Sequence, residues 1–142
     1  MADTEMAEIL YELEVGGHKL TPLRLALIEI FGRQQRPLLL EELGKLLMGT
    51  LIRVHRATLY RELVFLESRK IIATVSLEDG KRRYEFADRD HHHHLVCTSC
   101  KKIEDVELKD DEHGLDKLVK TQNDFLITHH SLEFFGLCGA CK

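Results

Sequence analysis

The residues with the clearest chemistry are four cysteines arranged as two matched pairs, Cys97-x-x-Cys100 and Cys138-x-x-Cys141. Each pair can turn two thiolates toward one metal ion, and two pairs complete the tetrahedral all-sulfur set that Zn²⁺ accepts. The 37 residues 101–137 separate the pairs, so a shared metal would hold a whole domain together rather than one hairpin. The alternatives are a redox-active dithiol or unrelated buried thiols. The matched spacing favours a structural zinc site.

A run of four histidines, His91 to His94, forms a second candidate metal site. The residues that follow are typical of a β-strand, in which successive side chains point to opposite faces. His91 and His93 would then share one face, and His92 and His94 the other. Ligands elsewhere in the chain can complete two separate sites: Glu85 and Asp105 for one, Glu112 and His130 for the other. An expression tag or a solvated patch is the alternative, but the run lies inside a predicted strand.

Basic residues of the first half form a third group. In residues 56–69 the leucines Leu59, Leu63 and Leu66 have the spacing of one buried helix face, so Arg56, Tyr60 and Arg61 project elsewhere. After this helix, two β-rich runs are joined by Asp79-Gly80, a pair suited to a tight hairpin turn. The basic residues at the tip of this hairpin are Lys81, Arg82 and Arg83. The alternative interpretation is that these arginines form only a solvated helix face. Nucleic-acid binding is favoured because the arginines occur together with Tyr60 and a basic hairpin.

Composition narrows the class of protein. The chain has 142 residues, 44% of them hydrophobic and 31% charged, which is typical of a soluble globular protein and permits two small domains. No apolar run is long enough to span a bilayer, and no secretory signal opens the sequence, so we expect a cytoplasmic protein. The net charge of −4 is uneven, because residues 16–87 carry +5, residues 88–142 carry −4 and residues 1–15 carry −5. The positive charge of residues 16–87 favours binding to a polyanion, and the negative charge and histidines of residues 88–142 favour binding of cations.

The predicted elements give an α+β fold. Helices are expected at about 7–13, at 22–32 after the N-cap Thr21, from Pro37 to about Met48, and at 56–69, followed by a hairpin within 71–87. Three short helices, a helix with exposed Arg and Tyr, and a basic hairpin form a winged helix-turn-helix. The second half is expected to hold a strand at 91–97, a strand near 101–108, a helix at about 111–121 and a final strand, which is a small α/β unit. We therefore expect two domains, 1–87 and 88–142.

At this point the sequence resembles the ferric uptake regulator family of metal-dependent bacterial repressors, which includes peroxide-, zinc- and manganese-sensing relatives. The resemblance runs from about Gly17 to Cys141. It is carried by KLTPLR, ATLYREL, YE, HHHHLVCTSC, HHSLEFFGLC and the final Cys-x-x-Cys, in this order and spacing.

The resemblance implies a winged-helix DNA-binding domain hinged to a dimerisation domain, and a homodimer whose two recognition helices read a palindromic operator. Thr58, Tyr60 and Arg61 match the DNA-contacting stretch of the recognition helix, and Lys19 and Arg24 match basic residues near the DNA backbone. Lys and Arg contacts to phosphates give a salt-dependent affinity, and a tyrosine can contact base edges or thymine methyl groups.

The resemblance also assigns the metal ligands. Cys97, Cys100, Cys138 and Cys141 match the structural zinc site; Glu85, His92, His94 and Asp105 match the sensing site; His91, His93, Glu112 and His130 match a further site, with His93 where Asp is common. The family's sensing site usually takes an additional histidine just before the third helix, where this chain has Arg36-Pro37-Leu38. We expect metal still to close the hinge, through Glu85.

The expected function is a metal-responsive transcriptional repressor of metal-homeostasis genes that is not an enzyme. The expected cofactors are a structural Zn²⁺ and a regulatory Fe²⁺, Mn²⁺ or Zn²⁺, since mixed nitrogen and oxygen ligands suit all three ions. The alternatives are a peroxide sensor that uses histidine-bound iron, a thiol redox protein or metalloenzyme, and a zinc-storage protein. The redox and enzymatic alternatives lack a matched nucleophile and base.

Overall fold

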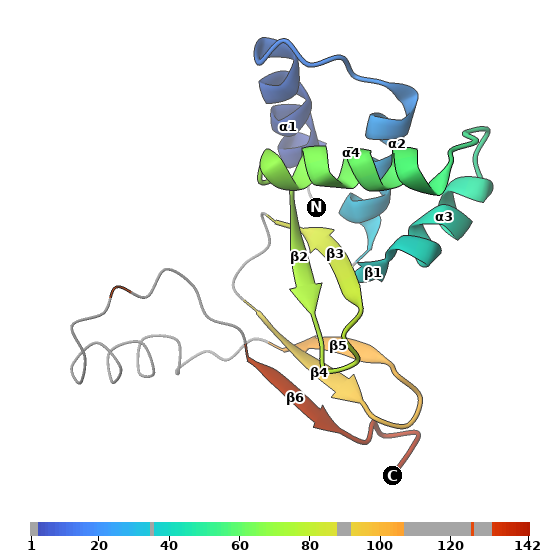
Figure 1. Ribbon diagram of the computed structural model, residues 1–142. Helices are drawn as coiled ribbons and strands as arrows, with labels where there is room; N and C mark the ends of the chain where they lie inside the picture. The colour runs from blue at the N-terminus through green and yellow to red at the C-terminus, as the bar shows by residue number, and fades with distance from the viewer. Residues whose placement is uncertain (1–2, 35, 88–91, 107–125, 127–131) are drawn as a thin grey trace. The chain divides into compact units, whose positions relative to one another are not determined.

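The computed structural model describes residues 3–34, 36–87, 92–106, 126 and 132–142 (Figure 1). The chain divides into two compact units, Met1–Asp88 (unit 1) and Arg89–Lys142 (unit 2). Within the described ranges, no helix has both the length and the apolar character needed to cross a membrane.

Unit 1 contains four helices: α1 (Asp3–Val15), α2 (Pro22–Arg33), α3 (Leu40–Met48) and α4 (Arg56–Ser68). The start of α2 is the predicted one, because the hydroxyl of Thr21 accepts a hydrogen bond of 3.2 Å from the backbone N–H of Arg24 and a proline occupies the first turn. α1 ends where Gly17 takes a φ of 76°, a left-handed conformation that favours glycine. α1 is several residues longer than the predicted helix, at both ends.

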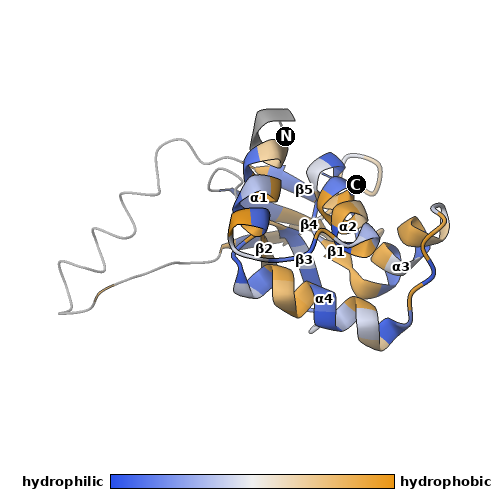
Figure 2. Cartoon of the chain, turned by 90° about the horizontal axis from the view of Figure 1, so that it is seen from above, coloured by the Kyte–Doolittle hydropathy of each residue, from blue (hydrophilic) through white to orange (hydrophobic). Residues whose placement is uncertain are grey.

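The core of unit 1 lies between α2, α3 and α4. Leucines of α4 at the predicted spacing are fully or almost fully buried, and they pack with buried residues of α2 and α3: Leu27, Ile28, Phe31, Leu43, Leu47, Leu59, Leu63 and Leu66. Hydrophobic and hydrophilic stretches alternate along α4 (Figure 2). Burying one such side chain contributes about 1.5–3 kcal/mol, so the leucine stripe fixes which face of α4 is left for solvent.

A small sheet completes unit 1. Strand β3 (Arg82–Phe86) lies between β1 (Leu38–Leu39) and β2 (Ile72–Ser76), and both pairings are antiparallel. The prediction of a helix starting directly after Pro37 was wrong at its first residues, because Leu38 and Leu39 pair with Tyr84 and Arg83 and the helix begins at Leu40. An apolar run of this length fits a strand or a helix equally well, and the distant β3 decides between them.

The hairpin of β2 and β3, with its connecting loop, is called the wing. Its loop comprises residues 77–81, since Ser76 pairs with Arg82, and is therefore longer than the predicted tight turn. Gly80 takes a φ of 67° within it. Arg83 donates two hydrogen bonds, of 2.8 and 2.6 Å, to the carboxylate of Asp79. This bidentate pair closes the loop and removes Arg83 from the exposed basic tip.

Unit 2 contains a second sheet, in which β4 (His93–Cys97) lies between β5 (Ile103–Val106) and β6 (Glu133–Gly136). β4 is antiparallel to β5 and parallel to β6, and a parallel pair is what the predicted α/β unit requires. The strand starts at His93 rather than His91. The helix predicted at 111–121 lies outside the described residues.

Candidate metal centres and nucleic-acid interface

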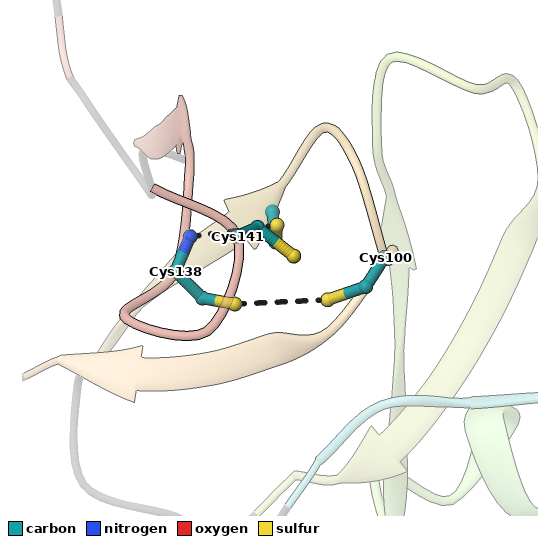
Figure 3. A group of neighbouring side chains, drawn as sticks. Cys100, Cys138 and Cys141 are labelled. Carbon is teal, nitrogen blue, oxygen red and sulfur yellow. Dashed lines mark hydrogen bonds between the residues drawn. The ribbon is translucent and has the colours of Figure 1, made fainter.

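Both cysteine pairs lie in turns that follow strands of unit 2. Cys97 ends β4 and Cys100 lies in the turn after it, while Cys138 and Cys141 follow β6. Because β4 and β6 are parallel, with Cys97 opposite Gly136, both turns leave the same end of the sheet. The four sulfur atoms lie within 4.8 Å of one another, and the labelled side chains converge as shown in Figure 3. The structure thus brings together four residues that the sequence places in two distant pairs.

The distances in this cluster fit a tetrahedral metal ion. With zinc–sulfur bonds of about 2.3 Å, two sulfurs of a tetrahedral site lie about 3.8 Å apart. The sulfurs of Cys100 and Cys138 are 3.7 Å apart. The backbone N–H of Cys138 donates to Cys97 Sγ at 3.4 Å, and this bond is the main cause that lowers the pKa of Cys97 to about 6. The pKa of Cys141 is raised to about 11, because neighbouring thiols outweigh the opposing effect of a hydrogen bond with Ser99.

Three of the four residues assigned to the sensing site lie together in unit 2. His94 and Asp105 are directly opposite each other in the β4–β5 pair, and His94 Nε2 is 3.8 Å from Asp105 Oδ1. The ring centroids of His92 and His94 are 5.0 Å apart, and the two ring planes are nearly perpendicular. His94 lies in β4, whereas His92 precedes the first residue of that strand, so the shared strand face stays a prediction. Glu85 belongs to unit 1, where it is buried in β3 opposite Ala73.

The residues assigned to the further metal site are mostly outside the described part of the chain. His93 is buried, with 3% of its surface exposed, and occupies β4 opposite Val106. His91, Glu112 and His130 lie outside the described residues.

Arg36 and Pro37, which stand where a family histidine is usual, have other structural roles. The guanidinium of Arg36 binds the carboxylate of Glu42 at 2.7 Å, and Pro37 is buried. The same carboxylate accepts the backbone N–H of Leu39 at 2.8 Å, at the start of α3. Burial alone would raise the pKa of Glu42, but the hydrogen bonds from Arg36 and Leu39 outweigh it and hold this pKa below its usual range. This segment therefore contributes the Arg36–Glu42 ion pair to the fold and contains no histidine to bind a metal.

The candidate nucleic-acid interface is an exposed, basic face of unit 1. The predicted DNA contacts of α4 and the wing are exposed: Arg56, Thr58, Tyr60, Arg61, Lys81 and Arg82. A cleft of about 740 Å³ is lined by Arg56, Tyr60, Lys81, Arg82 and the buried Tyr84, together with Glu41 of α3, which lies 3.8 Å from Arg56. A hydrogen bond joins Arg82 to Tyr84, while burial raises the pKa of Tyr84. Helix and wing therefore present cationic and aromatic groups side by side.

Arg24 is much less exposed than Lys19, the other basic residue expected near a DNA backbone. Lys19 is exposed, but only 9% of the surface of Arg24 is exposed. Its guanidinium bonds to both carboxylate oxygens of Glu62 on α4, at 2.5 and 3.2 Å, and to the carbonyl of Lys19 at 2.6 Å. It also lies over the ring of Phe65, 3.8 Å from the centroid. These contacts hold the guanidinium within unit 1, and the assignment of Arg24 as a DNA contact stays a prediction from the resemblance.

Comparison with known proteins identifies the family. The family model described as the ferric uptake regulator family matches residues 15–135. The chain belongs to this family. The ferric uptake regulation protein of Bordetella parapertussis is 33% identical over 132 residues, covering 92% of this chain and 94% of that protein. The peroxide operon regulator of Bacillus subtilis is 29% identical, covering 100% of this chain and 97% of that protein.

A solved structure supports the same fold. The ferric uptake regulator of Helicobacter pylori, reported to have three functional metal-binding sites, superimposes with a TM-score of 0.82 at 26% identity and covers 99% of this chain and 94% of its own. The α+β fold with its winged helix is thus confirmed. The ferric uptake regulator family consists of transcription regulators, so this chain is a metal-responsive transcriptional repressor and not an enzyme. Peroxide sensing, the alternative from the sequence, is not favoured.

Proposed function

We propose that this repressor is a cytoplasmic homodimer that binds a palindromic operator, with residues 1–87 as the DNA-binding domain and residues 88–142 as the dimerisation domain. The observation that supports it best is the shared cleft between α4 and the wing, where Arg56, Tyr60, Lys81 and Arg82 meet. A helix in the major groove with a basic hairpin beside it can contact bases and phosphates together. Lys19 and Arg61 would add phosphate contacts and Thr58 would face a base edge, all three being exposed.

Zn²⁺ is the proposed occupant of the four-cysteine cluster. Its support is the sulfur separation of 3.7 Å and the donation of a backbone N–H to Cys97, both of which suit thiolate ligands of one ion. Bound there, zinc would supply structural cross-linking and no reaction chemistry. The four cysteines would hold the turns after β4 and β6 at one end of the sheet.

A second divalent ion, Fe²⁺, Mn²⁺ or Zn²⁺, is proposed to bind His92, His94 and Asp105, with Glu85 as the ligand from unit 1. The support is the contact between the His92 and His94 rings, whose centroids are 5.0 Å apart, and the position of Asp105 opposite His94. Imidazole and carboxylate groups suit each of these ions. Glu85 would couple metal binding to DNA binding, because it lies in β3, the same wing strand that begins with the exposed Arg82. His91, His93, Glu112 and His130 are proposed to form the additional site.

The test measures the affinity of the protein for DNA with and without each regulatory metal ion. A duplex selected by the protein from a random-sequence pool is titrated by fluorescence anisotropy under anaerobic conditions, with protein that holds only its cysteine-bound zinc. Fe²⁺, Mn²⁺ and Zn²⁺ are then added in separate experiments. We expect one ion to tighten binding at least about tenfold, a coupling of roughly 1.4 kcal/mol. Glu85→Gln should abolish this coupling but retain the metal-free affinity. Equal affinity in all metal states would contradict metal-gated repression.

A further inference from the structure

One guanidinium in unit 1 connects three separate segments. Arg24 lies in α2, and its hydrogen bonds reach the carbonyl of Lys19 in the loop before α2 and the carboxylate of Glu62 on α4. The ring of Phe65, one turn further along α4, lies beneath the same group. The ring of His18 packs edge-on against this phenyl ring, with centroids 5.1 Å apart. The loop that carries Lys19 is therefore attached to α4 through Arg24 and through Phe65.

The contact between Arg24 and Glu62 is largely buried, and its two hydrogen bonds fix the orientation of the groups. Only 11% and 15% of the side-chain surfaces of Arg24 and Glu62 are exposed, so water cannot replace a lost partner easily. The bidentate contact fixes the plane of the guanidinium, and stacking on Phe65 fixes its position above the ring. The buried leucines of α4 fix which face of the helix packs on the core, and the Arg24–Glu62 contact adds a directional link between α4 and the loop that carries Lys19.

The position on α4 matters for recognition. Glu62 directly follows Arg61 and is two residues beyond Tyr60, both of which are exposed on the candidate DNA-contacting face. A rotation of α4 about its axis would move these side chains relative to Lys19, which contacts the DNA backbone in the proposed function. Recognition of bases needs the helix and the phosphate contacts to be in register.

We propose that Arg24 and Glu62, with Phe65, form a clamp that sets the orientation of the recognition helix α4 relative to the phosphate-contacting Lys19. Arg24 is a positioning residue in this inference and does not contact DNA. The inference rests on the proposed function, since it assigns a task to residues within the same DNA-binding unit. It replaces the role that the sequence alone implies for Arg24.

The experiment compares three variants of the full-length, metal-loaded protein. Glu62→Gln removes the charge of the clamp, and Arg24→Lys retains a positive charge but loses the planar bidentate contact. Glu29→Gln is the matched control, because Glu29 forms an exposed ion pair with Arg33 within α2. Each protein is titrated with the duplex selected by the wild type and with a shuffled duplex of equal length, across a series of salt concentrations. Circular dichroism establishes that each variant is folded.

We expect Glu62→Gln and Arg24→Lys to lose roughly tenfold in affinity for the selected duplex, comparable to the loss of one base contact, with little change on the shuffled duplex. The slope of affinity against salt should be unchanged, since no phosphate contact is removed. Glu29→Gln should match the wild type. If Arg24→Lys binds both duplexes like the wild type, or if Glu62→Gln keeps full selectivity, the clamp is overturned. Wild-type protein that selects no sequence would instead overturn the proposed function, and the clamp with it.

Discussion

Removal of the zinc ion proposed for the four-cysteine cluster is expected to unfold unit 2 and leave unit 1 folded. The cluster links turns that are separated by residues 101–137, and closing a loop of this length by a covalent cross-link stabilises a fold by about 4 kcal/mol. Among the described residues of unit 2, the buried hydrophobic side chains are Cys97 and Ile103. Because Cys97 is itself a proposed ligand, the comparison is with Ile103, whose burial contributes about 1.5–3 kcal/mol, less than the cross-link.

Unit 1 has no comparable dependence, because its helices enclose a large leucine-rich core. The assay is hydrogen exchange followed by mass spectrometry, before and after anaerobic chelation in the presence of a reductant. We expect β4, β5 and β6 to lose protection, while α2 and α4 retain it. Cys138→Ser should reproduce the effect of chelation. Ala140→Ser is the control, at an exposed position between Cys138 and Cys141. Retained protection of β4 and β6 in the chelated protein would refute the reasoning.

Three further predictions concern unit 1. Glu42→Gln should lower the free energy of unfolding at pH 7 by about 0.5–1 kcal/mol, because the half-exposed pair with Arg36 is screened by solvent. The depressed pKa of Glu42 means that its stabilisation is present above the unfolded pKa of about 4.3 and is lost as pH falls through the lower folded value, so the urea midpoints of variant and wild type should approach each other as pH falls below about 4.3. A gap that stayed constant from pH 7 into the acid range would contradict this. Thr21→Ala should cost about 1 kcal/mol in urea unfolding through loss of the α2 cap, and Thr21→Ser should recover most of it. Lys81→Ala should weaken binding to selected and shuffled duplexes alike and reduce the salt slope by about 1; an unchanged slope would place Lys81 away from phosphates.

Local patterns were sufficient to predict the start of α2 and the buried face of α4. Thr21 and Pro22 mark the start of α2, and the spacing of Leu59, Leu63 and Leu66 identifies the buried face of α4, because capping and helical periodicity are properties of neighbouring residues. The cysteine pairs were recognisable for a similar reason. Two copies of one short spacing are visible without any knowledge of the fold, and the structure places all four sulfurs together.

Pairings between distant residues could not be predicted in this way. Strand β1 exists because Leu38 and Leu39 meet β3, and no local pattern distinguishes these residues from the first turn of a helix. The partnership of Arg24 with Glu62 spans 38 positions, so Arg24 was indistinguishable from an exposed basic residue. The length of the wing loop depends on the register of β2 and β3 and on the Arg83–Asp79 pair, which the Asp-Gly signal alone does not specify.

The parallel pairing of β4 with β6 also sets the order in which the two units acquire structure. β2 and β3 are joined by a short loop and can pair as soon as both are synthesised, whereas β4 must wait for β6, near the C-terminal end of the sequence. Closing a long loop before any contact forms is slow, and the N-terminal part of a chain folds first during synthesis. We therefore expect a newly made chain to fold unit 1, the proposed DNA-binding domain, before its second unit closes. Binding of the proposed zinc ion would then be a late folding step, because its four ligands come together only when β6 has paired with β4.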